Sequence, residues 1–344
     1  MKRSNLRVMM LVHPDLVPPD DLTDPDDPRM ENVRTEFDVR KALLTLGHDV
    51  CMVAVEDEIT PIRHAIRDWK PHIAFNLMEE FANNSSLDYY VVSFLDMLKV
   101  PYTGCNPRGL LLARDKALSK KLMSYHRIKV PRFHVFPRGR SISARNIPKL
   151  PYPMVVKSLL EQGSVGIARA SFVNNAEELV ERVIQVHAMT DGDVIAEQYI
   201  DGRELYVTVL GNKRLQVLPV RELVFRGDAE GEERIATYKV KWDEKYRARH
   251  GIDYQFVRNL PAGMAEYLPK LGKRIYRTLE LSGYARIDLR LDTNGVVYVL
   301  EANPNAALSE SDDMAFSAEK AGMNYPQFIQ RLLNIGLAAR GGQN

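Results

Sequence analysis

The sequence predicts an α/β protein with three domains: an N-terminal parallel α/β domain over 1–114, a small central α+β domain over 115–202 and a C-terminal α+β domain over 203–344. A length of 344 residues suits two or three domains of ordinary size. Short apolar runs alternate with helical patterns in the first third of the chain, which is typical of a parallel sheet with helices on both faces. A hydrophobic fraction of 45% is enough for buried cores.

Charge and cysteine content exclude several classes of protein. The 47 basic and 45 acidic side chains give a net charge of +2, which argues against a dedicated nucleic-acid binder. Two cysteines, Cys51 and Cys105, cannot form a disulfide framework and suit a reducing compartment. No apolar run reaches the roughly 18 residues of a membrane span, and no signal-peptide cleavage site follows the apolar N-terminal run. We therefore expect a cytoplasmic protein without a nucleic-acid or membrane partner.

The N-terminal domain opens with Leu6–Val12, an apolar run with the length of a buried strand. The Asp- and Pro-rich segment 14–28 predicts a long loop without helix or strand. Gly47 is a suitable helix end. The further elements expected here are helices over 30–46, 60–69 and 87–98 and strands over 49–55 and 73–77.

The rest of the chain changes pattern after residue 115. In the central part we expect helices over 116–126 and 176–189, strands over 154–157, 167–173 and 194–200, and a Gly/Ser loop over 161–166. In the C-terminal part we expect strands over 204–210, 285–292 and 296–301, a polar and flexible stretch over 227–254, and a helix over 264–281.

The segment 284–306 carries the strongest local signal in the chain. Asn294-Gly295 between alternating apolar runs predicts a β-hairpin with those two residues as its loop. Asp288 then lies opposite Glu301, and Arg286 lies opposite Asn303, so that all four share one face. The residues expected to face the core are Ile287, Leu289, Leu300 and Ala302.

This polar face has the composition of a metal site. Directly paired side chains have Cβ atoms about 4.5–5.5 Å apart, so Asp288 and Glu301 repel each other unless a cation lies between them. The oxygen of Asn303 adds a third hard donor, and oxygen-only ligands favour Mg²⁺ or Mn²⁺ over zinc. The alternative is a solvated sheet face on which Arg286 pairs with the acids. The eight histidines show no metal-ligand spacing and are expected to be structural or on the surface.

Lys157 ends a strand next to the Gly/Ser loop, and loop amides beside a lysine can bind phosphate. The spacing is not that of a Walker P-loop, and the alternative is an ordinary surface turn. The charge of Lys157 has no acidic partner that is evident in the sequence. Glu197 and Glu204 stand at strand ends, where an acid can contact a ribose or the amine side of adenine. The alternative for each is a solvated strand end.

The order of these motifs resembles that of the ATP-grasp superfamily, and within it the D-alanine–D-alanine ligase family. The resemblance covers essentially the whole chain and is strongest from residue 100 onward. Five segments carry it: PYTGCNPRGLLLARDKALSKKLM (101–123), PYPMVVKSLLEQGSVGI, EQYIDGRELYVTVLG, TYKVKW and ARIDLRLD with YVLEANPN.

The resemblance implies a three-domain ATP-grasp architecture in which the central domain, with loop 161–166, is a lid. The implied nucleotide site consists of Lys116, Lys157, Glu161, Gly163, Ser164, Glu197, Gln198, Tyr199, Ile200, Glu204 and Lys241. Within it, the resemblance implies that Glu197 and the backbone of 198–200 contact adenine and that Glu204 contacts the ribose. The implied catalytic residues are Arg286, Lys241 and Ser164, and the implied metal ligands are Asp288, Glu301 and Asn303.

The activity implied by the resemblance is that of an ADP-forming carboxylate–amine ligase. The reaction would pass through an acylphosphate, with ATP and Mg²⁺ or Mn²⁺ as cofactors and amino acids or small peptides as substrates. A homodimer is left open. The alternatives are a catalytically silent ATP-binding regulatory module, an ATP-grasp enzyme whose acceptor is not an amine, and a genuine D-alanine–D-alanine ligase.

Several positions depart from the family pattern on the substrate side. The Asp/Pro-rich segment 14–28 replaces the family motif that holds the ammonium group of the first D-alanine. Gly163 replaces the first serine of the lid pair, and Trp242 replaces the tyrosine that usually follows the phosphate lysine. We therefore predict that D-alanyl-D-alanine is not the main product. The alternative is that Glu36 has taken over the ammonium group.

Overall fold

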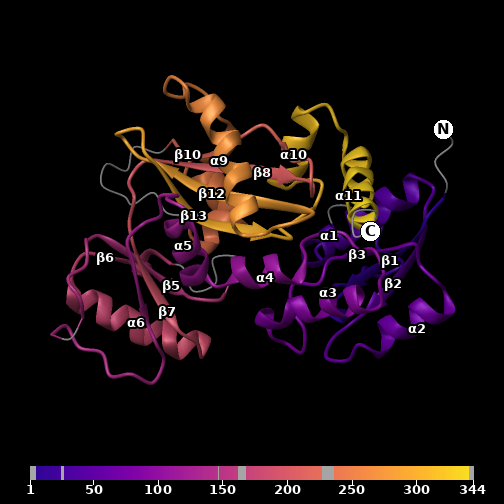
Figure 1. Cartoon of the computed structure of the whole chain (residues 1–344), viewed down its shortest axis with the longest axis horizontal. Coiled ribbons are helices and arrows are strands. Elements are labelled where there is room, and N and C mark those ends of the chain that lie inside the picture. Colours follow the sequence, from indigo (N-terminus) through magenta and orange to yellow (C-terminus); the bar gives the residue numbers. More distant parts are fainter. Residues whose placement is uncertain (1–4, 25–26, 146, 162–167, 227–235, 341–344) are drawn as a thin grey trace.

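The computed structural model describes residues 5–24, 27–145, 147–161, 168–226 and 236–340. Three β-sheets follow one another along the chain, and helices cover or connect them (Figure 1). The sheets occupy residues 7–76, 133–198 and 203–304. Within the described residues, no helix is both long and apolar enough to cross a membrane.

The first sheet is parallel and has the order β2-β1-β3. The central strand β1 (Arg7–Val12) pairs with β2 (Asp49–Ala54) on one side and with β3 (Ile73–Asn76) on the other. All three predicted strands are confirmed within one or two residues. The described part of the Asp/Pro-rich segment contains one short 3₁₀ turn, Pro14–Leu16, where no helix was predicted.

Helices cover both faces of the first sheet, as predicted. They are α1 (Met30–Thr45) and α11 (Tyr325–Arg340) on one face and α2 (Thr60–Asp68) and α3 (Asp88–Met97) on the other. Val8 and Met10 pack against the first pair, and Met9 and Leu11 pack against the second. The helix α11 is the last described element, and it contacts α1 and β3. The C-terminal part of the chain therefore packs on the N-terminal sheet (Figure 1).

The second sheet is antiparallel, with the order β4-β7-β5-β6. Its strands are β4 (Phe133–Phe136), β7 (Val194–Gln198), β5 (Met154–Ser158) and β6 (Phe172–Val173). The helix α6 (Ala176–Thr190) packs on one face of this sheet. The strand predicted over 167–173 is wrong in its first part, because Arg169–Ser171 forms a 3₁₀ turn and only two residues pair with β5.

The third sheet is antiparallel and holds the candidate site. Its order is β11-β10-β8-β12-β13, with β9 paired to β8. The strands are β8 (Arg203–Leu210), β9 (Gln216–Val217), β10 (Arg221–Phe225), β11 (Ile252–Phe256), β12 (Tyr284–Leu291) and β13 (Val297–Pro304). The helix α9 (Met264–Thr278) covers the apolar face, where Leu268 and Ile275 pack with Val207, Ile287 and Leu289. The opposite face remains available for polar side chains.

The stretch 227–254, predicted to be flexible, is helical and extended in its described part. The helices α7 (Tyr238–Trp242) and α8 (Glu244–Arg249) precede β11. Thr237 and Asp243 cap the two helices, since each side chain accepts a hydrogen bond from a backbone N–H of the first turn. Each helix has only five or six residues, and such short elements give almost no periodic signal.

Two helices connect the first sheet with the others. They are α4 (Pro107–Arg114), which was not predicted, and α5 (Lys116–Tyr125), which was. Asp115 caps α5 by accepting hydrogen bonds from the N–H groups of Ala117 and Leu118. With this cap, α5 begins at Lys116. The start of the helix lies beside the end of β5, since the Lys116 N–H donates to the Leu159 carbonyl oxygen at 3.4 Å. The remaining helix, α10 (Asp313–Lys320), follows β13.

Candidate active site

The hairpin β12–β13 places the predicted pairs together, although its loop differs from the prediction. Asp288 pairs with Glu301 and Arg286 with Asn303, as predicted. Near the loop, however, Leu291 pairs with Val297, one residue away from the partner expected for a two-residue loop. A β-bulge between Asp288 and Leu289 compensates for this shift. The loop shifts the pairing by one residue, and the bulge shifts it back by one residue, so Asp288 and Glu301 are paired as predicted.

The bulge changes the role of Leu300. Leu289 pairs with Val299, so Val299 fills the core position that was predicted for Leu300. Leu300 instead lines the cavity described below. Ile287 and Ala302 are buried in the core as predicted. A bulge inserts one unpaired residue into a strand, and sequence alternation alone does not reveal it.

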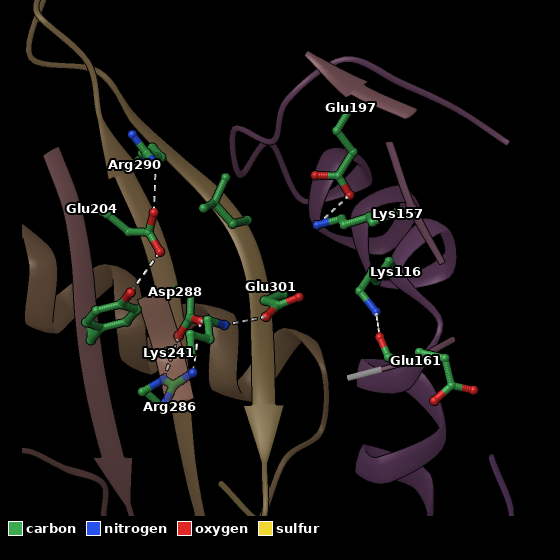
Figure 2. Close-up of polar contacts among 12 residues, drawn as sticks. Lys116, Lys157, Glu161, Glu197, Glu204, Lys241, Arg286, Asp288, Arg290 and Glu301 are labelled. Carbon is green, nitrogen blue, oxygen red and sulfur yellow. Dashed lines mark hydrogen bonds and ion pairs between the residues drawn. The ribbon is translucent and has the colours of Figure 1, made fainter. Parts of the chain in front are cut away.

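Two cations surround the paired carboxylates (Figure 2). Arg286 donates two hydrogen bonds to Asp288, at 2.8 Å and 3.1 Å. The Nζ atom of Lys241 lies 3.7 Å from Asp288 Oδ2 and 3.8 Å from Glu301 Oε1. The alternative hypothesis was a solvated sheet face on which Arg286 pairs with the acids. Arg286 does pair with Asp288, but the face is not solvated, because the Asp288 side chain is only 2% exposed.

The pKa values of the two carboxylates shift in opposite directions. Burial raises the pKa of Asp288, and the charges of Arg286 and Lys241 offset only part of that rise. Burial also acts to raise the pKa of Glu301, but Lys241 and Lys157 outweigh it and hold this pKa below its ordinary value. Glu301 is therefore the carboxylate that stays ionised over the widest pH range.

The donor set fits a hard divalent cation. Asp288, Glu301 and Asn303 offer oxygen atoms only, and the ammonium group of Lys241 already lies where a positive charge contacts both carboxylates. The amide of Asn303 is buried, and its Nδ2 atom has no hydrogen-bond partner among the described residues. Over the same residues, no group of three or more His, Cys, Asp or Glu side chains is arranged to hold a metal ion. A cation here would therefore need further ligands, such as phosphate oxygens.

A cavity lies between the second and third sheets, bordered by this hairpin. Figure 2 shows Lys157 and Glu197 across from Arg290, Asp288 and Glu301. The second sheet and the turn after β7 contribute Val155, Lys157, Glu197, Gln198, Tyr199 and Ile200. The third sheet and its flanking segments contribute Glu204, Ala236, Lys241, Asp288, Arg290, Leu300 and Glu301. Nine predicted site residues thus meet in one cavity.

Lys157 has an acidic partner that the sequence did not reveal. Its Nζ atom lies 3.1 Å from Glu197 Oε1, and the Nζ atom of Lys120 lies 3.0 Å from the same oxygen. Burial acts to raise the pKa of Glu197, but the two lysines outweigh it and lower this pKa. The expectation that Lys157 lacks an acidic partner is therefore wrong, because β5 and β7 pair and bring the two residues together.

Lys116 points toward the backbone that leads into the Gly/Ser loop. Its ammonium group donates to the carbonyl oxygens of Glu161 and Leu159, and the residue is not part of the cavity wall. Burial is the main cause that lowers the pKa of Lys116 to about 8. The Glu161 carboxylate accepts a hydrogen bond from Ser85 at 3.2 Å. Gly163 and Ser164 lie outside the described residues.

Glu204 is held from two sides at the cavity wall. Arg290 donates to its Oε2 atom and the Tyr206 hydroxyl donates to its Oε1 atom, both at 2.8 Å. Arg290 and Lys120 were not predicted as site residues. Arg290 extends the alternation of Arg286 and Asp288 by two residues, so it shares their face. Lys120 follows Lys116 by four positions, which places both on one side of a helix.

Two further acids, Asp312 and Asp313, interact with the charge of Arg286. Asp313 pairs with Arg221 at 3.0 Å, and Asp312 accepts a hydrogen bond from the Ser309 N–H at 2.7 Å. Burial raises the pKa of both acids, and Arg286 opposes that rise. Glu36 on α1 is 5% exposed, and chiefly burial raises its pKa to about 7.

Comparisons with known proteins agree with the fold and identify the family. A family model described as the C-terminus of D-Ala-D-Ala ligase matches residues 122–334. A D-alanine–D-alanine ligase of Desulforudis audaxviator is 28% identical over 309 residues, which cover 89% of this chain and 94% of that protein. A D-alanine–D-alanine ligase of Desulfotalea psychrophila is 31% identical and covers 74% of this chain and 76% of its own length.

Solved structures share the fold at lower sequence identity. The D-alanine–D-alanine ligase of Bacillus anthracis complexed with ATP aligns with a TM-score of 0.74 at 20% identity, covering 98% of this chain and 100% of that one. The VanG D-Ala:D-Ser ligase of Enterococcus faecalis aligns with a TM-score of 0.69 at 16% identity, covering 97% and 100%. Because the family model spans more than half of the chain, the chain belongs to the D-alanine–D-alanine ligase family of the ATP-grasp superfamily.

Proposed function

We propose that this ADP-forming carbon–nitrogen ligase binds its nucleotide in the cavity between the second and third sheets, with Asp288, Glu301 and Asn303 as ligands of a Mg²⁺ or Mn²⁺ ion. The observation that carries this proposal is the pair Asp288–Glu301, which faces Lys241 on one wall of the cavity while Lys157 lies on the other. Family membership supports the activity, and the geometry supports the location.

The cations of the cavity are placed to stabilise negative charge. Bound Mg-ATP supplies a γ-phosphate that converts a substrate carboxylate into an acylphosphate, from which an amine displaces phosphate. Lys157 and Lys241 line the cavity, and Arg286 is fixed by its two hydrogen bonds to Asp288. Fixed cations in a water-poor site stabilise charge that develops in a transition state more strongly than water does. Arg286 and Lys241 are thus our candidates for the catalytic cations.

We place the nucleoside end of the cavity where β7 ends and β8 begins. Glu204 is held by Arg290 and Tyr206, so its carboxylate cannot turn away from the cavity. Each carboxylate oxygen can accept more than one hydrogen bond, which leaves capacity for a ribose hydroxyl. The backbone of 198–200 follows β7 and borders the same space, where we place the adenine.

The substrates are proposed to be amino acids or small peptides other than two D-alanines. The Asp/Pro-rich segment replaces the usual ammonium-binding motif, and the half-buried Asp312 and Asp313 lie near enough to Arg286 for its charge to oppose the rise of their pKa values. The side chain of Trp242 lies outside the described residues. A cytoplasmic location and a homodimer stay predictions.

The test is ADP release from the purified protein with Mg-ATP and a panel of L-amino acids, D-amino acids and dipeptides, followed by product mass. Release that depends on an amine and yields an amide supports the ligase. ATP binding without release under every condition would instead support a silent regulatory module. Release without an amide product would indicate an acceptor that is not an amine.

A further inference from the structure

Lys120 is a fully buried cation that connects the two walls of the cavity. It belongs to α5, a helix that Figure 1 shows between the second and third sheets, and its side chain is 0% exposed. Its ammonium group lies 3.0 Å from Glu197 Oε1 on β7 and donates a hydrogen bond to the carbonyl oxygen of Leu300 on β13. One charge therefore contacts both sheets, although Lys120 is not part of the cavity wall.

The contact with Glu197 determines the charge that the cavity presents. Burial lowers the pKa of Lys120, and the charge of Glu197 opposes that fall. With both lysines protonated, two ammonium groups face Glu197 Oε1, and the three side chains together carry one excess positive charge. Lys157 lines the cavity and Lys120 lies behind it. With Lys120 balancing the carboxylate, the charge of Lys157 is left for an anion in the cavity. Without Lys120, the carboxylate and Lys157 would neutralise each other.

The contact with Leu300 acts on the other wall. Leu300 is the residue of the β-bulge that restores the pairing of Asp288 with Glu301. A bulge leaves one residue without its regular ladder partner, and here the carbonyl group of that residue accepts a hydrogen bond from Lys120. The next residue along the strand is Glu301. Fixing this carbonyl group thus fixes the backbone from which the proposed metal ligand projects.

We propose that Lys120 is a positioning residue that balances Glu197, so that Lys157 can bind phosphate, and that holds the Leu300 bulge, so that Glu301 can bind the metal ion. This inference rests on the proposed nucleotide and metal site, and it assigns a separate task to a residue that touches neither ligand. If Lys120 has this role, two measurable quantities depend on its buried charge: the affinity for ATP and the Mg²⁺ concentration that the reaction requires.

The experiment compares Lys120→Met, the double variant Lys120→Met/Glu197→Gln and the control Lys121→Met, which removes the exposed neighbouring lysine. Calorimetry measures ATP affinity, and a titration with magnesium chloride at saturating ATP measures the half-saturating Mg²⁺ concentration. We expect Lys120→Met to weaken ATP binding about tenfold or more, which corresponds to at least about 1.4 kcal/mol. The control should match the parent protein.

The double variant separates the two tasks. It restores the excess positive charge, so ATP should bind at least about threefold more tightly than to Lys120→Met, even though the Glu197 side chain of the cavity wall is also changed. The Mg²⁺ requirement should stay raised, because the Leu300 carbonyl still lacks its donor. Parent-like ATP affinity in Lys120→Met, or no recovery in a folded double variant, overturns the charge-balance task. A parent-like Mg²⁺ requirement in the double variant overturns the bulge task.

Folding and the proposed function are controlled separately. If Lys120→Met does not fold, the double variant is the one to measure, because replacing a buried ion pair by neutral groups is usually tolerated. In that variant, ATP affinity more than tenfold below the parent value overturns the charge-balance task, and a parent-like Mg²⁺ requirement overturns the bulge task. If the parent protein itself binds no ATP, the proposed function fails. If the parent protein binds ATP and the variants behave like it, only the role of Lys120 fails.

Discussion

Asp288 lies directly opposite Glu301 on neighbouring strands, and the ammonium group of Lys241 is less than 4 Å from both carboxylates. This relationship survives a loop that is one residue longer than expected, because the bulge at Leu300 corrects the register. A site that depends on such a correction should be sensitive to small changes in either strand.

We predict that Glu301→Gln abolishes turnover and leaves the fold intact. The amide keeps the size of the side chain but removes the negative charge that faces Lys241 and the proposed metal ion. Steady-state ADP release and circular dichroism measure the two effects. Glu319→Gln, at an exposed position of α10, is the control. Undiminished turnover in Glu301→Gln would remove Glu301 from the site.

Magnesium should bind only together with nucleotide. Asp288, Glu301 and Asn303 supply few ligands, and Mg²⁺ usually completes its shell with water and substrate phosphates. Calorimetric titration with magnesium chloride should show no heat of binding without nucleotide and clear binding with a non-hydrolysable ATP analogue. Tight binding to the protein alone would mean that the donor set is larger than proposed.

Lys157→Ala should weaken ATP binding about tenfold to a hundredfold. One charge-assisted contact typically contributes about 1.5–3 kcal/mol. We expect little loss of folding stability, because Lys120 remains beside Glu197 when Lys157 is removed. Calorimetry and thermal unfolding check the two statements. Equal ATP affinity in variant and parent would contradict the phosphate assignment.

Glu36 should make stability depend on pH between about 4.5 and 7. Burial raises its pKa to about 7 in the folded state, so the folded protein holds more protons than the unfolded chain in this window. The contribution to stability is complete below the unfolded pKa and is lost as pH rises through the folded one, by at most about 1.4 kcal/mol per pH unit.

The variant Glu36→Gln should therefore flatten this part of the profile and raise the free energy of unfolding at pH 7.5. Denaturant unfolding across the pH range is the measurement. Glu31→Gln is the matched control, since Glu31 lies on the same helix and is exposed. An identical slope in Glu36→Gln and the parent protein would exclude Glu36 as its source.

D-Alanine should not give the highest specificity constant in the substrate panel. A site built on polar contacts can discriminate by factors of about 10⁴–10⁵ when those contacts are missing, and we predict that the segment 14–28 replaces one set of them. ADP release with D-alanine alone, compared with other amino acids and dipeptides, is the measurement. A maximum at D-alanine would favour the alternative that Glu36 binds the ammonium group.

The sequence by itself determined the local features of this protein. Alternation along β12 and β13 placed Asp288 and Glu301 on one polar face, because side chains of a strand point to opposite sides in turn. Alternating strands and helices identified the parallel first sheet. The same reasoning missed α7 and α8, since short helices show no full period, and it misjudged Leu300, since a bulge interrupts the alternation.

Only the tertiary structure decided which charges meet. Lys120, Lys157 and Glu197 come from a helix and two strands that are far apart in the chain, and their contact depends on the packing of α5 and the pairing of β5 with β7. Spacing along a chain predicts contacts within one element or one hairpin, where geometry is local. Contacts between elements depend on how whole sheets and helices pack, and for that reason the net charge of this cavity could not be read from the sequence.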